Sequence, residues 1–164
     1  MGSAALDFGI ILRELATHKV DFIVVGGVGA ALQGAPLATF DLDVVHSRHP
    51  ENVDRLLAAL QALEAYYREQ PTKRLTPSAS ALAGPGHHLL MTRVGPLDLL
   101  GVVTGGRAYD DLLQHSLDMQ LDAKVSIKVL SLAMLITLKE ELGRDKDLAA
   151  LAVLRRSLEE GGKA

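Results

Sequence analysis

Two aspartates separated by a single residue, Asp41 and Asp43, lie in an otherwise largely apolar segment, 41–46. We expect this segment to form a β-strand, in which side chains i and i+2 point to the same face. The two carboxylates then project together, while Leu42 and Val44 face a core. Neighbouring carboxylates repel each other unless a cation lies between them. Oxygen ligands on a strand suit Mg²⁺, which commonly binds one or two carboxylates together with substrate phosphates.

A pair of glycines upstream could hold those phosphates. The β-branched and aromatic segment 22–25 predicts a buried strand, which Gly26-Gly27 ends before a short helix over 28–33. Glycine has no Cβ to block the approach of a ligand to the backbone, and a helix start offers free N–H groups to phosphate. The phosphates would then belong to a nucleoside triphosphate.

A third carboxylate, Asp98, lies in the apolar segment 97–103, which we expect to pair with a strand over 87–93 across a turn at Gly95-Pro96. An acid facing inward from such a strand needs a compensating partner. A strand beside Asp41 and Asp43 would bring Asp98 to the same cation and complete a two-metal site.

Each of these features also has a simpler interpretation. The glycine pair can be only a turn, the aspartate pair a solvated sheet edge, and Asp98 a surface acid on a hairpin. The neighbouring His87-His88 can be a ligand or a base, or merely exposed at a strand end. The three acids and two glycines in this order favour the metal and phosphate site.

Composition limits the other possibilities. The 164 residues are 48% hydrophobic, 23% charged and 4% aromatic, which suits one domain with an aliphatic core. There is no cysteine, so disulfides and thiolate metal sites are excluded. The net charge of −3 offers no basic field for non-specific DNA binding. The longest apolar run is far shorter than the roughly 20 residues of a membrane span, so we expect a cytoplasmic protein with no membrane partner.

The remaining patterns predict an α+β fold, a small mixed sheet with flanking helices and two C-terminal helices. We expect a single domain over 1–164, with a core at about 20–128 and a helical part at about 131–160. A loop is expected over 68–86. The Ser131 side chain should cap a helix that ends at Gly143. Further helices are expected over 5–18, 50–63, 109–114 and 145–158, and short strands over 66–67, 119–121 and 125–129.

The order of these motifs resembles the signature of the polymerase-beta-like nucleotidyltransferase superfamily. That signature is a strand ending in two small residues, a helix and loop, Asp-hydrophobic-Asp in the next strand, and a later lone Asp. The resemblance is greatest to a small bacterial branch that includes minimal and toxin–antitoxin-associated nucleotidyltransferases. Its loop reads Gly-x-x-Arg-x-Thr-x-Asp-hydrophobic-Asp, of which this chain keeps Gly34, Thr39, Asp41 and Asp43.

The resemblance implies Mg²⁺-dependent transfer of a nucleoside monophosphate from ATP or another NTP to a hydroxyl group. Asp41, Asp43 and Asp98 would be the catalytic and metal-binding residues. Nucleotide binding would fall to the glycine pair and two further residues: Gly26, Gly27, Thr39 and Lys139. The acceptor could be a protein, an RNA or a small molecule.

Several alternatives accompany this assignment. Lys139 could simply be solvated, and the segment 144–147 could form an ion network at a helix start. Leu37 stands where the branch usually has Arg, so a cation that could meet phosphate or a partner is missing. The alternative function is therefore a weak or inactive relative that acts by binding a partner protein.

Two other nucleotide or phosphate sites are excluded. A dinucleotide fingerprint beginning at Gly27 would place its third glycine at Leu32, and the acids follow too closely. A haloacid-dehalogenase-like phosphatase needs a strand that runs into its first aspartate, whereas a loop over 34–36 precedes Asp41.

Overall fold

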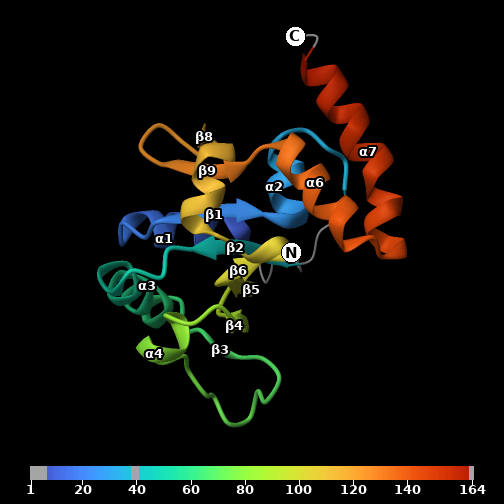
Figure 1. The fold of residues 1–164 in the computed structure, drawn as a ribbon. Coiled ribbons are helices and arrows are strands. Elements are labelled where there is room, and N and C mark those ends of the chain that lie inside the picture. Colours follow the sequence, from blue (N-terminus) through green and yellow to red (C-terminus); the bar gives the residue numbers. More distant parts are fainter. Residues whose placement is uncertain (1–6, 38–40, 163–164) are drawn as a thin grey trace.

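The computed structural model describes residues 7–37 and 41–162. Within them a seven-stranded mixed sheet carries helices on both faces, which confirms the predicted α+β class (Figure 1). The strands of this sheet are β1 Phe22–Val25, β2 Leu42–His46, β3 Tyr66–Tyr67, β4 His87–Thr92, β5 Gly95–Leu100, β8 Ser116–Gln120 and β9 Ser126–Leu130. The helices are α1 Phe8–Thr17, α2 Gly26–Leu32, α3 Pro50–Ala62, α4 Ala79–Leu82, α5 Tyr109–Leu112, α6 Leu132–Leu142 and α7 Asp145–Gly162.

The strand order is β3-β4-β5-β2-β1-β9-β8. The pairs β2–β5 and β1–β9 are parallel, and the other neighbours in this sheet are antiparallel. The centre of the sheet is therefore formed by β5, β2 and β1, and the predicted acids and the glycine pair lie on these strands or next to them.

Two apolar clusters lie on opposite faces of the sheet. One joins α1, α3 and α4 to alternate residues of β1 and β2, among them Val24, Leu42 and Val44. The other joins α5, α6 and α7 to the intervening residues, such as Val25 and Val45. The alternation follows from the pleat of a strand, which turns successive side chains to opposite faces. Asp43, between Leu42 and Val44, consequently lies on the face that α6 and α7 partly cover.

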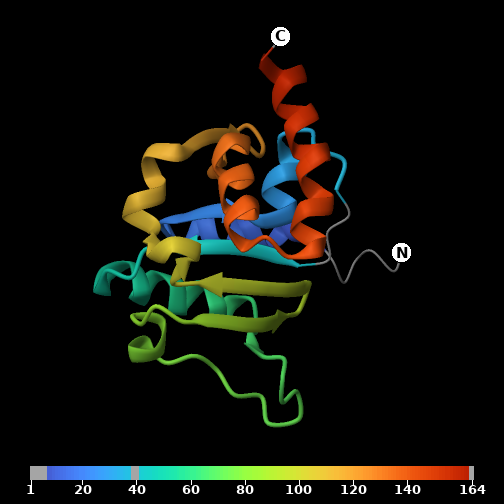
Figure 2. The same ribbon diagram turned by 45° about the vertical axis from the view of Figure 1, so that its right-hand side comes forward.

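The two C-terminal helices form as predicted. The Ser131 hydroxyl accepts a hydrogen bond from the backbone N–H of Met134, and Gly143 ends α6 in the left-handed region at φ +62°. Helices α6 and α7 pack side by side at one end of the sheet (Figure 2). In α7, Leu151 and Leu154 are buried, whereas Leu148 and Leu158 are exposed.

The glycine pair differs from the prediction, because α2 begins at Gly26 itself and no separate turn follows β1. The helix predicted over 28–33 therefore starts two residues earlier. Gly26 has a φ of +66°, which a residue without a Cβ adopts at little cost. The direct join brings the start of α2 against the neighbouring strand β2.

The expected hairpin strand over 97–103 is split in two. Its first part, β5, begins at Gly95, so the turn lies at Arg93-Val94. Its second part, β6 (Val102–Val103), pairs with β7 (Arg107–Ala108) in a separate two-stranded sheet. The break falls at Gly101, where a Cβ would come within 2.5 Å of the carbonyl oxygen of Gly84. This backbone crossing could not be seen in the local pattern.

The loop predicted over 68–86 contains the short helix α4, whose start is capped by the Ser78 hydroxyl and whose Leu82 is buried. The strand expected over 119–121 begins earlier, at Ser116. None of the helices in the described ranges combines the length and the apolar character needed to cross a membrane.

Candidate functional site

The parallel pairing of β2 with β5 places two of the predicted acids directly opposite each other. Asp43 and Asp98 are Cα partners in this register, just as Leu42 is paired with Leu97. On the other side of β2, Val25 pairs with Asp43, so the residue before the glycine pair joins the same row. Asp98 is only 8% exposed, which excludes the simpler interpretation of a surface acid.

Gly26 lies in contact with Asp43. A Cβ built on Gly26 would be 2.4 Å from the Asp43 Oδ2 atom, far inside van der Waals contact. The carboxylate therefore occupies the space that a side chain at this position would need. The glycine at the start of α2 and the aspartate of β2 form one geometric unit, although 17 positions separate them in the sequence.

We name Asp41, Asp43 and Asp98 the acidic group, and Asp43 interacts electrostatically with both of the others. Burial raises the pKa of its carboxyl to about 7, and the charge of Asp98 and a hydrogen bond with it add to the effect. The charge of Asp41 raises this pKa further, whereas the charge of Lys139 opposes the rise. A carboxyl so placed is ionised at neutral pH only in part unless a cation balances it.

Arg68, which the sequence motifs did not indicate, brings a cation to the neighbouring acids. Its Nη1 donates to Asp98 Oδ1 over 2.6 Å and to the backbone carbonyl of Leu90 over 2.9 Å. Its Nη2 lies 3.9 Å from Asp41 Oδ2. Arg68 directly follows β3, and its backbone N–H bonds to Leu89, so it continues the strand pairing into the segment expected to be a loop. Extending the strand alternation by one residue would have given Arg68 a face of its strand, but only the pairing of β3 with β4 brings it to the acids.

A second cationic group lies on α6 and α7. The Asp147 carboxylate, 0% exposed, accepts hydrogen bonds from Lys139 over 3.1 Å and from Arg144. These two cations hold the pKa of Asp147 well below its ordinary value. The ion network expected at the start of the last helix thus includes Lys139, which was expected to be either a nucleotide contact or a solvated side chain. Lys146 makes no ion pair with a described residue.

Two cavities meet at the acidic group. The first, of about 420 Å³, we name the cationic cavity; it is lined by Gly26, Gly27, Ala30, Leu37, Asp41, Asp43, Leu135, Lys139, Arg144, Lys146, Ala150 and Leu154. The second, of about 300 Å³, we name the leucine cavity; it is lined by Val25, Gly26, Asp43, His87, Leu89, Asp98, Leu100, Val103, Thr104, Leu135, Leu138, Lys139, Leu142 and Arg144.

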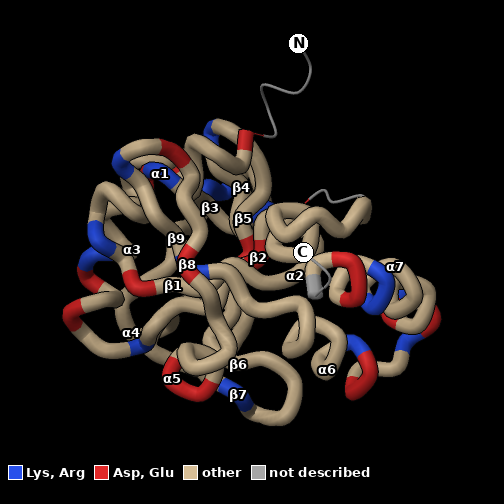
Figure 3. Tube along the Cα trace, turned by 90° about the horizontal axis from the view of Figure 1, so that it is seen from above, with Lys and Arg blue, Asp and Glu red and all other residues tan. Residues whose placement is uncertain are grey.

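Seen from above, acidic positions of β2 lie between β5 and α2, and acidic and basic positions are interspersed along α7 (Figure 3). The predicted residues Gly26, Gly27, Asp41, Asp43 and Lys139 all line the cationic cavity. Asp43 also lines the leucine cavity, where it is joined by Asp98. The structure therefore brings together the predicted site residues that it describes. Thr39 lies outside the described residues.

The side chains of the neighbouring His87 and His88 lie on opposite faces of the sheet. His87 lines the leucine cavity, and its Nε2 lies 3.1 Å from the carbonyl oxygen of Val102. His88 is buried beside Tyr67, whose hydroxyl lies 2.8 Å from the His88 Nδ1 atom. Because strand residues alternate between faces, His88 points away from Asp98 and cannot act at the acidic group.

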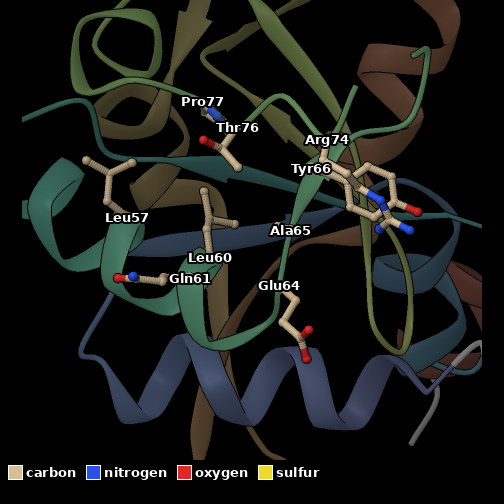
Figure 4. Close-up of a pocket in the computed structure, with 9 residues that line it drawn as sticks. All are labelled: Leu57, Leu60, Gln61, Glu64, Ala65, Tyr66, Arg74, Thr76 and Pro77. Carbon is tan, nitrogen blue, oxygen red and sulfur yellow. The ribbon is translucent and has the colours of Figure 1, made fainter. Parts of the chain in front are cut away.

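A third cavity, of about 480 Å³, lies apart from these residues, between α3 and the segment 74–77 (Figure 4). Leu57 and Leu60 form part of its wall, and the Arg74 guanidinium stacks over the Tyr66 ring at 4.0 Å from the ring centre. None of the predicted site residues within the described ranges lines this cavity.

The acidic group has the donor atoms that a magnesium ion prefers, but its side chains are not arranged as a complete set of metal ligands. Its donors are carboxylate oxygens, the ligands that Mg²⁺ prefers, and a bound cation would balance the mutual repulsion of Asp43, Asp98 and Asp41. Within the described ranges, however, no three His, Asp or Glu side chains are already gathered around one point as metal ligands would be. Arg68 instead balances Asp98 directly.

No protein-family model matches the sequence, and no curated protein is similar enough to count as a relative. Solved structures share the fold, and two of them are nucleotidyltransferases by name. One is a candidate nucleotidyltransferase from Thermotoga maritima, with a TM-score of 0.55, 19% identity, and coverage of 93% of this chain and 91% of that chain. The other is the lincosamide antibiotic adenylyltransferase LnuA in its lincomycin-bound form, with a TM-score of 0.55, 12% identity, and coverage of 91% and 96%. The protein therefore has the nucleotidyltransferase fold that the sequence motifs predicted.

Proposed function

We propose that this protein is a nucleotidyltransferase that transfers a nucleoside monophosphate from ATP or another NTP to a hydroxyl group, with Mg²⁺ as cofactor. The observation that carries the proposal is the pairing of Asp43 with Asp98 in adjacent parallel strands, with Gly26 packed against Asp43. The fold shared with an antibiotic adenylyltransferase supports it.

Asp41, Asp43 and Asp98 would hold the metal ions. Asp41 and Asp43 face the cationic cavity, and Asp43 and Asp98 face the leucine cavity, so the acidic group reaches both sides of the site. Bound there, magnesium would neutralise phosphate charge and lower the pKa of the acceptor hydroxyl. Arg68 would compete with the metal for Asp98, because its Nη1 already bonds to that carboxylate.

The chain's own cations and glycines would hold the donor phosphates. Gly26 and Gly27 line the cationic cavity without a side chain in the way, and Lys139 and Lys146 line the same cavity. Buried Asp147 fixes Lys139 in place, so its ammonium is positioned before a ligand arrives. Such positioning lowers the entropy cost of binding. We keep Thr39 as a further proposed nucleotide contact.

A second function is favoured by Leu37. This residue packs against the apolar cluster around α6 and α7 and lines the cationic cavity. A cation at this position would favour the binding of phosphate in that cavity, whereas a leucine does not. A weakly active or inactive protein that works by binding a partner protein, for example in a toxin–antitoxin pair, would not need that cation. Arg68 argues for the enzyme, because it brings a guanidinium to the acids from another segment.

Calorimetric titration with ATP, with and without Mg²⁺, tests the proposal. We expect Mg²⁺-dependent binding by the wild type and its loss in Asp41→Asn/Asp43→Asn, because the metal ligands are gone while the side-chain volume is kept. The matched control is Asp110→Asn/Asp118→Asn, which removes two carboxylates that are 74% and 70% exposed. Wild-type protein that binds no ATP at millimolar concentration would decide for the partner-binding function.

A further inference from the structure

The two cavities that meet at Asp43 differ in chemistry, and this difference bears on the acceptor, on the assumption that the proposed transferase function holds. They share Gly26, Asp43 and the α6 side of the site. A transfer reaction needs two substrates on opposite sides of the reacting phosphorus. Two adjoining cavities with the acids between them match that need.

The cationic cavity suits the triphosphate. Both residues of the glycine pair line it, and so does Lys146, which does not line the leucine cavity. The Lys146 side chain is exposed and makes no ion pair with a described residue. A nucleoside triphosphate is strongly anionic, and a free ammonium group attracts it from solution. The donor therefore belongs on this side, which leaves the leucine cavity for the acceptor.

Much of the wall of the leucine cavity is apolar. Leu89 and Leu100 face it from the sheet, and Leu138 and Leu142 face it from α6. Leu142 is 43% exposed, although it lies at a cavity wall where a ligand could cover it. Covering such a side chain is favourable by about 25 cal/mol per Å² of apolar surface.

The polar residues in the lining are Asp43, Asp98, His87, Thr104, Lys139 and Arg144. Asp43 and Asp98 are paired across β2 and β5, and Asp147 already engages Lys139 and Arg144. A nucleic acid acceptor would bring phosphates to leucines and carboxylates, which is unfavourable. The volume of about 300 Å³ is at the lower end of the range for small-molecule sites, roughly 300–1,000 Å³.

We propose that the leucine cavity binds the acceptor and that the acceptor is a small, mainly apolar, uncharged molecule that carries a hydroxyl group. The acceptor's oxygen forms a bond to the α-phosphorus while the bond from that phosphorus to the bridging oxygen of the pyrophosphate breaks. The pyrophosphate leaves with the electron pair, and the hydroxyl proton passes to bulk water. The apolar walls orient the molecule, and the two carboxylates mark the end at which its hydroxyl lies.

The first test measures binding without activity. Saturation-transfer NMR with 2-phenylethanol, a small apolar alcohol, should show transfer from the wild-type protein. Leu142→Glu should reduce the signal about fivefold or more, because a carboxylate in the wall disfavours an apolar probe. Leu158→Glu is the matched control, since Leu158 is 41% exposed on α7 and lines neither cavity. Should Leu142→Glu fail to fold, Leu142→Ser takes its place. Equal losses in Leu142 and Leu158 variants would overturn the assignment.

The second test asks where the label goes. The full chain is incubated with Mg²⁺, ATP labelled at the α-phosphate, and separate small-molecule, RNA and protein fractions of a cell extract. We expect label in the small-molecule fraction and its loss in Leu142→Glu but not in Leu158→Glu. Label on RNA or protein would refute the acceptor class and leave the transferase intact. Absence of Mg²⁺-dependent ATP binding in the titration described above would instead refute the transferase itself.

Discussion

Replacing Asp43 with asparagine should stabilise the metal-free protein, and the gain should grow as pH rises. Asp43 is packed between Gly26 and Asp98, where ionisation costs free energy. Asparagine has the same shape and carries no charge. Its amide can still donate a hydrogen bond to a neighbouring carboxylate, so the variant removes the charge and little else.

The size of the effect follows from the pKa of Asp43, which is about 7 in the folded protein against an ordinary 3.8. The folded protein therefore binds this proton more tightly than the unfolded chain does. The stabilisation from the proton is complete below pH 3.8 and is lost as pH rises through 7. Each pH unit in that window costs at most about 1.4 kcal/mol, so the whole loss is at most about 4 kcal/mol.

Urea unfolding in EDTA at pH 5, 6, 7 and 8 measures this difference. The free energy of unfolding of Asp43→Asn minus that of the wild type should rise by up to about 3 kcal/mol between pH 5 and pH 8. Asp118→Asn, with a carboxylate that is 70% exposed on β8, controls for the loss of a strand acid. Saturating Mg²⁺ should stabilise the wild type and leave the variant nearly unchanged. A pH-independent difference would refute the reasoning about the buried charge.

The other predictions concern the backbone and the ion network. Gly26→Ala should lose more stability in urea unfolding than Gly34→Ala. Both glycines have a positive φ, which strains alanine by about 1–2 kcal/mol, but only at Gly26 would the new Cβ also meet a carboxylate oxygen, at 2.4 Å. Equal losses in the two variants would contradict this contact. Asp147→Asn should cost about 1–3 kcal/mol in the same assay, since two cations lose a fully buried partner, whereas exposed Asp145→Asn should change little. Arg68→Gln should lower the melting temperature in EDTA and tighten Mn²⁺ binding followed by electron paramagnetic resonance, because the guanidinium occupies a carboxylate that the metal needs; unchanged Mn²⁺ affinity would show that the two do not compete.

Local structure followed from local patterns. The strand over 22–25, the helix capped by Ser131 and the glycine that ends it were all predicted from neighbouring residues and are found in the structure. The placing of Asp43 opposite the core-facing side chains also followed, because strand alternation depends on nothing beyond the strand. These features involve residues only a few positions apart, whose geometry the backbone itself dictates.

The site as a whole depended on tertiary structure. The register that pairs Asp43 with Asp98 joins strands more than 50 positions apart, and it results from the packing of whole strands in one sheet. The same holds for Arg68, which reaches the acids only because β3 and β4 pair at the sheet's edge.

By itself the sequence therefore determined which residues could do chemistry and which way each points from its own strand. Only the tertiary structure decided that Asp43 and Asp98 are neighbours, that Arg68 joins them, and that two cavities of different chemistry meet there. The reason is physical: alternation and capping involve contacts between residues close in the chain, whereas register and cavity shape depend on packing between segments far apart in it.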